Sequence, residues 1–575
     1  MTIRFYLSLF LAVILTVPAS AQTDQNLIYG SFFGGHQTDR VSLRNAMALT
    51  DSGDWIIVGE TESVNFWVSD DALQPDYNVV FGRKGFITRM SSDGSPGYST
   101  FFGGSSGFPT HAISSFGDRY CVGGTTEAED FSVTEGAYNS VFEGSMSGFV
   151  TCFDNNNAVL WSTFLGSSDT DGVRDVCVTG DGIYATGFTA DANLGTPGTF
   201  APDFPENQSS SAFISKFDED GALIWLTYLY GSEAAPSVWH AESSPDGSRI
   251  YVYGDASDDS VPVTSGAHQE SFGGGVDVGL LCFSTDDGTL LWSTYFGGEQ
   301  EDFSGEMAVG SDGSVYISGQ TTSEGQIATD GSHQEELAGL TDWFLAKFTP
   351  EGEPVWATYF GGEEGESIPS LSFADGNLFL AGSTESTSGL IFGNPFEPEA
   401  EEGSLSSCMA KFDPEDGTLL WATYIGAEDQ NCAPASRLLS VGAGNFAFSG
   451  SIFGPSTCVS YTTGNAFQSF YPGGNFSIWY GILQENTLSV NDEEAPQAAR
   501  LFPNPCTDEV FIDLPGMLFS VMDVQVYDLA GRLMLNARGL NQGGALNTSA
   551  LGNGIYLLRA SAKRKMYTGK LTVTR

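Results

Sequence analysis

The chain has 575 residues, of which 71 are glycine, 13% are aromatic and only 16% are charged, and its net charge is −50. This length exceeds one ordinary hydrophobic core, and the glycine and aromatic content favours short strands joined by turns over helices or disorder. The excess of carboxylates excludes nucleic acid and anionic membranes as partners, because neither offers a counter-charge.

The first 21 residues predict a secretory signal peptide. Arg4 precedes an apolar run from Phe5 to Val17, and Ala19-Ser20-Ala21 forms a small-residue cleavage pattern. We expect cleavage between Ala21 and Gln22, since the run is too short for a stable membrane span. No cysteine follows the cleavage site and no later segment is apolar for long enough to cross a bilayer. The sequence therefore predicts an exported, soluble chain without a transmembrane segment.

Residues 22–485 repeat one unit seven times. A strand such as "LLWSTYFGG" recurs at intervals of about 63 to 69 residues, which is typical of stacked or radial repeats. Its aromatic residue stands at Tyr29, Tyr98, Trp161, Trp225, Trp292, Trp356 and Trp421. Two further landmarks recur in register, a strand like "GFITRM" and a strand like "GDWIIVGET" that ends at a glycine turn.

Each unit therefore predicts four strands, and four-stranded sheets repeated radially form a β-propeller. The repeat region begins with a fourth-type strand at Leu27 and ends with a third-type strand at Phe476 to Leu483. The N-terminal strand can thus complete the last sheet and remove the open edges. We expect an all-β, seven-bladed propeller that the N-terminal strand closes.

These units resemble the SBBP family, the bacterial seven-bladed β-propeller repeat. The resemblance rests on the W-x-T-Y-x-G-G strand, its trailing acidic residue and the G-x-x-Y-x-x-G strand, and it covers about Asn26 to Gln484. It implies an architecture and brings no common chemistry with it.

The C-terminal part has a different character. Residues 22–500 carry 13 Lys and Arg against 67 Asp and Glu, whereas residues 501–575 carry 8 against 5. After a polar linker over residues 486–499, residues 500–575 show short alternating strands with glycine turns, which predicts a small β-sandwich.

This segment resembles the C-terminal sorting domain of the type IX secretion system. The matching positions are Pro503, Asn504, Pro505, Tyr527, Asp528, Gly531, Arg532, Gly554, Tyr556, Arg559 and Lys570, whereas Cys506 is not part of the pattern. The resemblance implies the type IX secretion machinery as a partner. It also implies a secreted or outer cell-surface location, with the tail commonly removed. An ordinary adhesive sandwich is the alternative interpretation.

Two repeated features allow a structural and a functional interpretation. The recurring Trp and Tyr residues could stack on carbohydrate, but repetition at one strand position favours packing between blades. Acidic residues follow the Gly-Gly pairs at Asp39, Asp171, Asp302, Glu366 and Asp429. They could hold structural calcium, but we favour hydrogen bonds within the turns, and we expect no cofactor or catalytic metal.

The eight cysteines do not form the dense pattern of a disulfide framework. Cys121 and Cys177 take the places of Ile57 and Met47 in other repeats, so we interpret both as core residues. Cys432 and Cys458 belong to one repeat and are the one pair for which the sequence suggests a disulfide.

No catalytic motif stands out. His268 and His333 lie in a repeated turn, and His36, His111 and His240 share no recognisable constellation. We therefore expect a binding or interaction protein with an unknown protein or glycan ligand, held by long loops such as Thr189 to Ser211 and Thr384 to Ser406. The alternative is a polysaccharide-degrading hydrolase or lyase with a carboxylate pair near the propeller channel.

Overall fold

The computed structural model describes most of the chain from residue 23 onward, and it divides into two compact units, Gln22–Asn486 and Thr487–Arg575. The described residues are 23–42, 45–107, 112–166, 170–206, 208–229, 237–400, 402–403, 405–426, 437–442, 444–453, 462–463, 465–487, 497–514, 521–527, 532–541, 543–562 and 565–575. Within these ranges all regular elements are β-strands.

Seven antiparallel sheets make up the described part of the first unit, and we number them as blades along the chain. Blade 1 comprises β2 (Asp39–Val41), β3 (Met47–Leu49), β4 (Trp55–Thr61), β6 (Lys84–Met90) and β7 (Pro96–Phe102). Blade 2 comprises β9 (Ala112–Phe116), β10 (Arg119–Thr126), β11 (Ser147–Asp154) and β12 (Val159–Leu165). Blade 3 comprises β13 (Gly172–Val178), β14 (Ile183–Thr189), β15 (Ser211–Phe217) and β16 (Leu223–Tyr228). Blade 4 comprises β17 (Ser237–Ser243), β18 (Arg249–Ala256), β19 (Asp277–Ser284) and β20 (Leu290–Phe296).

The last three blades follow the same order. Blade 5 comprises β21 (Asp302–Val309), β22 (Val315–Thr321), β23 (Asp342–Phe348) and β24 (Pro354–Phe360). Blade 6 comprises β25 (Ser370–Ala374), β26 (Asn377–Thr384), β27 (Ser406–Phe412) and β28 (Leu419–Ile425). Blade 7 comprises β29 (Arg437–Gly442), β30 (Asn445–Phe453), β31 (Phe476–Thr487) and β1 (Thr23–Phe33). A short parallel pair, β5 (Phe81–Gly82) and β8 (Ser106–Gly107), connects the loops of blades 1 and 2.

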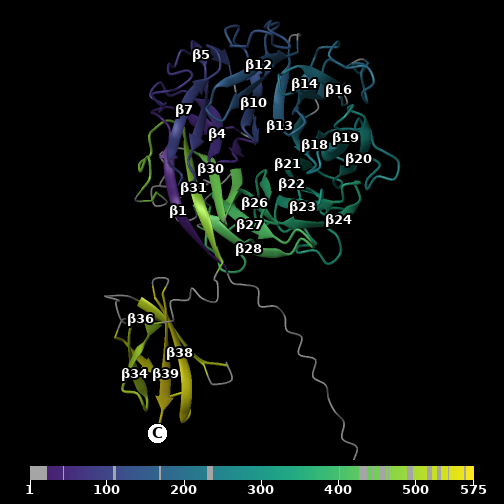
Figure 1. The fold of residues 1–575 in the computed structure, drawn as a ribbon. Helices are drawn as coiled ribbons and strands as arrows, with labels where there is room; N and C mark the ends of the chain where they lie inside the picture. Colours follow the sequence, from purple (N-terminus) through teal and green to yellow (C-terminus); the bar gives the residue numbers. More distant parts are fainter. Residues whose placement is uncertain are drawn as a thin grey trace, which may run out of the picture. The chain divides into compact units, whose positions relative to one another are not determined.

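The N-terminal strand closes the ring, as the sequence predicted. β1 pairs with β31 from the other end of the repeat region, so blade 7 contains strands from both ends (Figure 1). The hydroxyls of Tyr29 and Tyr480 lie 3.2 Å apart across this pair. The fold class is therefore a seven-bladed propeller of four-stranded blades, with the inner strand of blade 1 in two pieces, β2 and β3.

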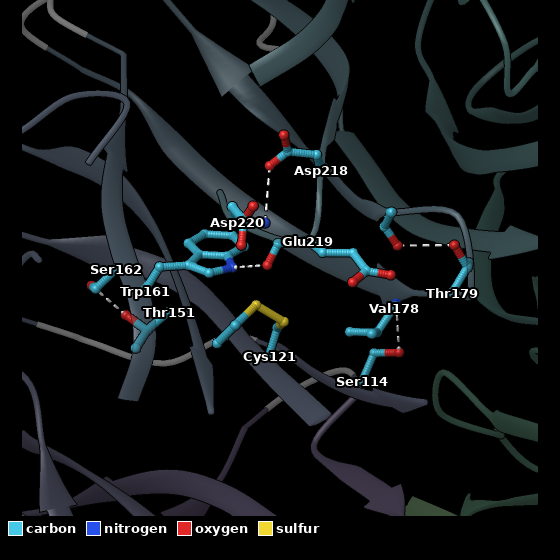
Figure 2. Close-up of a disulfide and its surroundings, with 12 residues drawn as sticks. Ser114, Cys121, Thr151, Trp161, Ser162, Val178, Thr179, Asp218, Glu219 and Asp220 are labelled. Atoms are coloured by element: carbon cyan, nitrogen blue, oxygen red, sulfur yellow. Dashed lines mark hydrogen bonds between the residues drawn. A yellow bond between two sulfur atoms is a disulfide. The ribbon is translucent and has the colours of Figure 1, made fainter. Parts of the chain in front are cut away.

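The recurring tryptophan joins each of blades 2 to 6 to the next blade, which confirms packing between blades. The indole Nε1 of Trp161 donates to the main-chain oxygen of Glu219 at 3.0 Å, in the hairpin turn of blade 3 (Figure 2). A Cβ on Gly221 of that turn would lie 2.6 Å from the Trp161 ring, so only glycine allows this contact. Trp225, Trp292 and Trp356 repeat the arrangement in blades 3, 4 and 5.

The long loop between the second and third strands covers the edge of the outer strand. In blade 1, Gln74 accepts a hydrogen bond from the main-chain N–H of Phe101, and its own N–H donates to the Thr100 hydroxyl at 2.8 Å. Equivalent contacts recur in all seven blades, through Gln74, Asn139, Ala201, Gln269, Gln334, Glu397 and Gln468. The loops we expected to bind ligand therefore have a structural role, since they protect an edge that could pair with another chain.

The structure corrects our interpretation of Cys121, which forms a disulfide with Cys152 (Figure 2). The strand register places Cys121 opposite Cys152, just as Ile56 lies opposite Arg89 in blade 1. The sequence comparison places Cys121 at Ile57, one residue away, and a shift of one residue conceals the pairing. Cys177 is buried and free, whereas Cys432 and Cys458 lie outside the described residues.

Replacing Cys121 and Cys152 together by alanine is expected to lower the free energy of unfolding by about 2–4 kcal/mol, because the disulfide restricts the unfolded chain. The bond joins residues 31 positions apart. Urea unfolding with and without reductant checks this. Reductant should destabilise the wild type and leave the double variant unchanged, whereas a wild type insensitive to reductant contradicts the prediction.

The second unit is a small β-sandwich around one apolar core. One sheet contains β32 (Gln497–Ala498), β39 (Lys565–Val573), β38 (Gly554–Ala562), β35 (Val521–Tyr527) and β36 (Leu533–Asn541). The other contains β33 (Arg500–Phe502), β34 (Glu509–Asp513) and β37 (Ala545–Asn547). Alternate residues of β38, such as Tyr556 and Leu558, face the core.

Candidate functional site

The acidic residues after the Gly-Gly pairs hold turns together, as we favoured. In blade 5, Asp302 accepts hydrogen bonds from the N–H of Gly298 at 2.7 Å and from the hydroxyls of Thr321 and Ser323. Asp39 repeats this pattern, and Asp171 and Glu366 accept the matching threonine hydroxyl. Asp429 lies outside the described residues.

Two carboxylate oxygens near these turns stay without a hydrogen-bond partner. They are Oδ1 of Asp277 and Oε2 of Glu366, and both are buried. Burial, with the charge of Asp302 as a smaller contribution, raises the pKa of Asp277 to about 6. No group of three or more His, Cys, Asp or Glu side chains in the described residues is placed to hold a metal ion. Structural calcium stays a prediction from the sequence.

The propeller is expected to unfold at a higher urea concentration at pH 5 than at pH 8. Burial raises the pKa of five carboxyl groups to about 6 or 7, at Asp39, Asp175, Asp277, Glu242 and Glu366. A raised native pKa means that the folded state binds more protons than the unfolded chain between pH 7 and 4, so stability rises as the pH falls through this window. Each carboxyl group makes the free energy of unfolding at pH 5 larger than that at pH 8 by more than about 1 kcal/mol. His268 and His333, whose pKa burial lowers, oppose this trend.

Asp277→Asn provides the control for this pH dependence. The amide resembles the protonated acid, so this variant should gain stability at pH 8 and little at pH 5. A midpoint that rises with pH across the window would contradict the prediction.

The central channel contains a cavity of about 340 Å³, lined by the inner strands of the seven blades. Its walls are unequal. Blades 1 and 7 contribute mainly apolar side chains such as Met47 and Leu439, and blade 2 contributes Ile113 with two serines. Blades 4 and 5 contribute the ionisable side chains His240, Glu242 and Glu306. A cavity of this size with a few ionisable groups on one side is typical of a ligand site.

One position of the inner strand varies in chemical character from blade to blade, and we call it the ring position; of its residues, His240 and Glu306 line the cavity. The ring position is paired with the residue of the second strand that directly precedes the recurring glycine of that strand. In blade 3 this glycine is Gly187. In blades 2, 3, 4, 6 and 7 the ring position holds Ala112, Asp175, His240, Ser370 and Arg437. Ala46 and Glu306 hold the corresponding places in blades 1 and 5, where Ala46 accepts from the N–H of Val58 and the main chain of Glu306 exchanges hydrogen bonds with the Ser318 hydroxyl. The repeat therefore fixes the backbone here and leaves the side chain free to differ. We call Asp175, His240, Glu306 and Ser370 the polar arc.

Asp175 and His240 are neighbours in this arc. Asp175 is fully buried and accepts hydrogen bonds from Asn45 Nδ2 at 2.7 Å and from the N–H of Ala241 at 2.8 Å. His240 is 3% exposed, and its Nδ1 lies 3.4 Å from Asp175 Oδ2. Neither ring nitrogen of His240 makes a hydrogen bond. His240 thus has a carboxylate beside it but its ring makes no hydrogen bond, and a buried imidazole of this kind in the wall of a cavity is a group that a ligand can satisfy.

Glu306 and Ser370 form the second pair. Glu306 Oε2 accepts hydrogen bonds from the Ser370 hydroxyl at 2.6 Å and from the N–H of Leu371 at 3.1 Å. Both bonds use the same oxygen. Glu242 lines the same cavity from β17, and burial raises its pKa to about 7, with the charge of Glu306 as a further cause. Two carboxylates thus face one cavity.

Sequence reasoning missed this arc. We had found no shared constellation for His240, because its neighbours stand in other repeats. The available signal was the strand register, since an alignment of the inner strands shows ionisable residues where blades 1 and 2 carry alanine. The other described histidines are elsewhere, with His36 bonded to the Pro472 oxygen and His268 and His333 beside phenylalanines.

In the C-terminal sandwich, the residues of the predicted sorting motif have distinct places. Asn504 bonds the backbone of β39, donating to the Lys570 oxygen at 2.6 Å and accepting from the N–H of Thr572 at 2.8 Å. Tyr556 is buried and donates to the Gly552 oxygen, and Tyr527 donates to Gln525. The remaining motif side chains that are described and charged are exposed, namely Arg532, Arg559 and Lys570.

Several predicted positions lie outside the described residues. These are Asp528 and Gly531 of the sorting motif and the signal-peptide residues Ala21 and Gln22. Gly554 begins β38, and Pro503 and Pro505 flank Asn504 between β33 and β34. Among the described residues, no helix is long and apolar enough to span a membrane.

Comparison with known proteins identifies the C-terminal unit. Residues 500–574 match the secretion system C-terminal sorting domain. The regulatory protein FlaEY of Caulobacter vibrioides is 26% identical over 234 residues, which cover 40% of this chain and 22% of that protein. The chain thus spans about a fifth of the length of this curated relative.

Solved structures with a similar fold have low sequence identity. The WD40 β-propeller domain of Doa1 is 11% identical, with a TM-score of 0.36, over 80% of this chain and 97% of that domain. The quinohemoprotein alcohol dehydrogenase from Comamonas testosteroni is 11% identical, with a TM-score of 0.37, over 84% and 79%. Neither likeness carries an argument about activity, and the propeller assignment follows from the strand pairing.

Strand pairing and the matched tail together define the class, an exported β-propeller protein with a C-terminal sorting domain. The tail is the sorting domain of type IX secretion. The protein is therefore exported and is attached to the cell surface or released there.

Proposed function

We propose that this protein is an exported binding module that takes its ligand in the central channel. The polar arc carries the proposal. Repeated side chains have structural partners, such as the tryptophan between blades and the carboxylate in the turn. The ring position departs from the repeat and places two unlike polar groups, His240 and Glu306, in the wall of one cavity. Asp175 lies beside His240, and Ser370 donates a hydrogen bond to Glu306. Groups that differ among otherwise equal blades support a role in recognition.

The propeller itself is proposed to be of the SBBP type. The register of its W-x-T-Y strand and the period of about 63 to 69 residues support this. The type IX machinery is proposed as the partner of the tail, and an extracellular protein or glycan as the partner of the propeller.

Binding to arrays of polysaccharides and glycoproteins tests the proposal, with the purified protein compared with His240→Asn. We expect saturable binding that the variant weakens, with every ligand intact by mass spectrometry. His268→Asn is the matched control, since His268 packs on Phe296 and does not line the channel cavity. Binding that both variants retain would place the ligand outside the channel and refute the proposal.

A glycan hydrolase or lyase is the second candidate, and one observation favours it. Glu242 and Glu306 line the same cavity, and the raised pKa of Glu242 suits a general acid near neutral pH. Shortened glycans in the array experiment, lost in Glu306→Gln, would support catalysis over binding.

A further inference from the structure

The chemical character of the channel cavity restricts what it can bind. Glu242 and Glu306 line it, and His240 lies in its wall with both ring nitrogens unsatisfied. Asp175 lies beside His240 but is not among the lining residues. The other polar residues of the lining are uncharged, namely Asn45, Ser114, Ser115 and Ser372. Arg437 holds the ring position of blade 7 but is not among the residues that line the cavity. The lining therefore carries an excess of negative charge.

The surroundings strengthen this field. Residues 22–500 carry 67 acidic against 13 basic side chains, and a cleft lined by charges of one sign concentrates the opposite ion. Anionic ligands are therefore disfavoured in the channel.

We infer that the channel binds a protonated primary amine, which donates to Glu242 and Glu306 beside His240. This inference rests on the proposed channel site and adds the chemical class of its ligand. An ammonium group carries three donors and no acceptor, so the carboxylate oxygens of Glu242 and Glu306 match it. Glu306 keeps Oε1 for this purpose, because Ser370 and Leu371 both bond Oε2. The amine belongs either to a lysine side chain or to an amino sugar.

Binding is coupled to a proton. The pKa of Glu242 is about 7, raised by burial and then by Glu306 on β21, so part of the population is protonated near neutral pH. The other ionisable groups around it are His240 on its own strand and Cys177 on β13, whose pKa Glu242 helps to raise. A bound cation favours the charged form of Glu242, so binding releases protons at pH 7 and weakens at pH 5.

Calorimetric titration of the full protein with n-butylamine tests the inference, with N-butylacetamide as the uncharged matched ligand. We expect binding of the amine only, proton release that differs between buffers at pH 7, and about tenfold or greater loss in Glu242→Gln and Glu306→Gln. Glu301→Gln is the control variant, since Glu301 is exposed and outside the cavity. Nα-acetyl-lysine amide and glucosamine, run in parallel, distinguish the two sources of the amine.

Each outcome of the titration either supports or overturns the inference. Amine affinity that Glu242→Gln leaves unchanged, or equal binding of the amide, overturns the inference. The inference is also overturned if an array ligand requires His240 while n-butylamine neither binds nor competes with that ligand. In that case the proposed channel site is still supported. If the binding of no ligand depends on His240, both the proposed channel site and the amine inference are refuted. Unfolding midpoints show whether Glu306→Gln folds, and Glu242→Gln, at a half-buried side chain, provides the second test.

Discussion

Replacement of Glu485 by alanine is expected to lower the free energy of unfolding of the propeller by about 3–5 kcal/mol. Glu485 lies near the end of β31, and its side chain is only 6% exposed. Its two carboxylate oxygens lie 3.0 and 2.9 Å from Lys411 Nζ, and one accepts from Trp421 Nε1 at 3.3 Å. The variant leaves the largely buried Lys411 without its carboxylate.

The reason for this pair is the closure of the ring. Elsewhere the tryptophan indole donates to a main-chain oxygen in the hairpin turn of the next blade, as Trp356 does to Pro414. Blade 7 has no such turn, because its third and fourth strands, β31 and β1, come from opposite ends of the repeat region. The Glu485 carboxylate therefore takes the place of the turn oxygen.

Urea unfolding of the full protein, followed by tryptophan fluorescence, measures the effect. Glu415→Ala is the matched control, because Lys347 makes the equivalent contact to Glu415 at 3.8 Å and that carboxylate is 84% exposed. Its loss should cost less than about 1 kcal/mol. Equal effects of the two variants would show that Glu485 has no special role in closure.

Periodicity decided how much of this structure could be predicted. Features that recur in all or most of the seven units were predictable, such as the four strands, the tryptophan contact and the turn carboxylate, because repetition separates a pattern from chance. The strand that completes blade 7 followed from the same count. The sorting motif was predictable for a different reason, since its positions match a known family.

Features that occur in only one unit of the repeat were not predictable. The Cys121–Cys152 disulfide depends on a register that is exact to one residue, and one shift in the alignment concealed it. His240 and Asp175 stand 65 positions apart and meet only because neighbouring blades bring their ring positions together. Such a contact has no local signature in the sequence.

The second large effect on stability is expected from removing the contact between the recurring tryptophan and the next blade. Trp356→Ala is expected to cost about 3–5 kcal/mol, since it removes a buried aromatic side chain and leaves a cavity between blades 5 and 6. Trp356 is 6% exposed, its Nε1 donates to the Pro414 oxygen at 3.2 Å, and Gly417 approaches its ring so closely that a Cβ there would lie 2.7 Å away. Gly417→Ala should also destabilise, because its φ of 72° adds backbone strain to the contact.

Val355→Ala is the control, at a neighbouring side chain that is 45% exposed, and it should change stability by less than about 0.5 kcal/mol. The variants are compared by urea unfolding. This comparison also separates packing from carbohydrate stacking, the alternative role for the aromatic residues. A covered indole offers no face to a sugar, so Trp356→Phe should lose stability and keep ligand binding. Loss of ligand binding in Trp356→Phe at unchanged stability would instead assign the tryptophan to recognition.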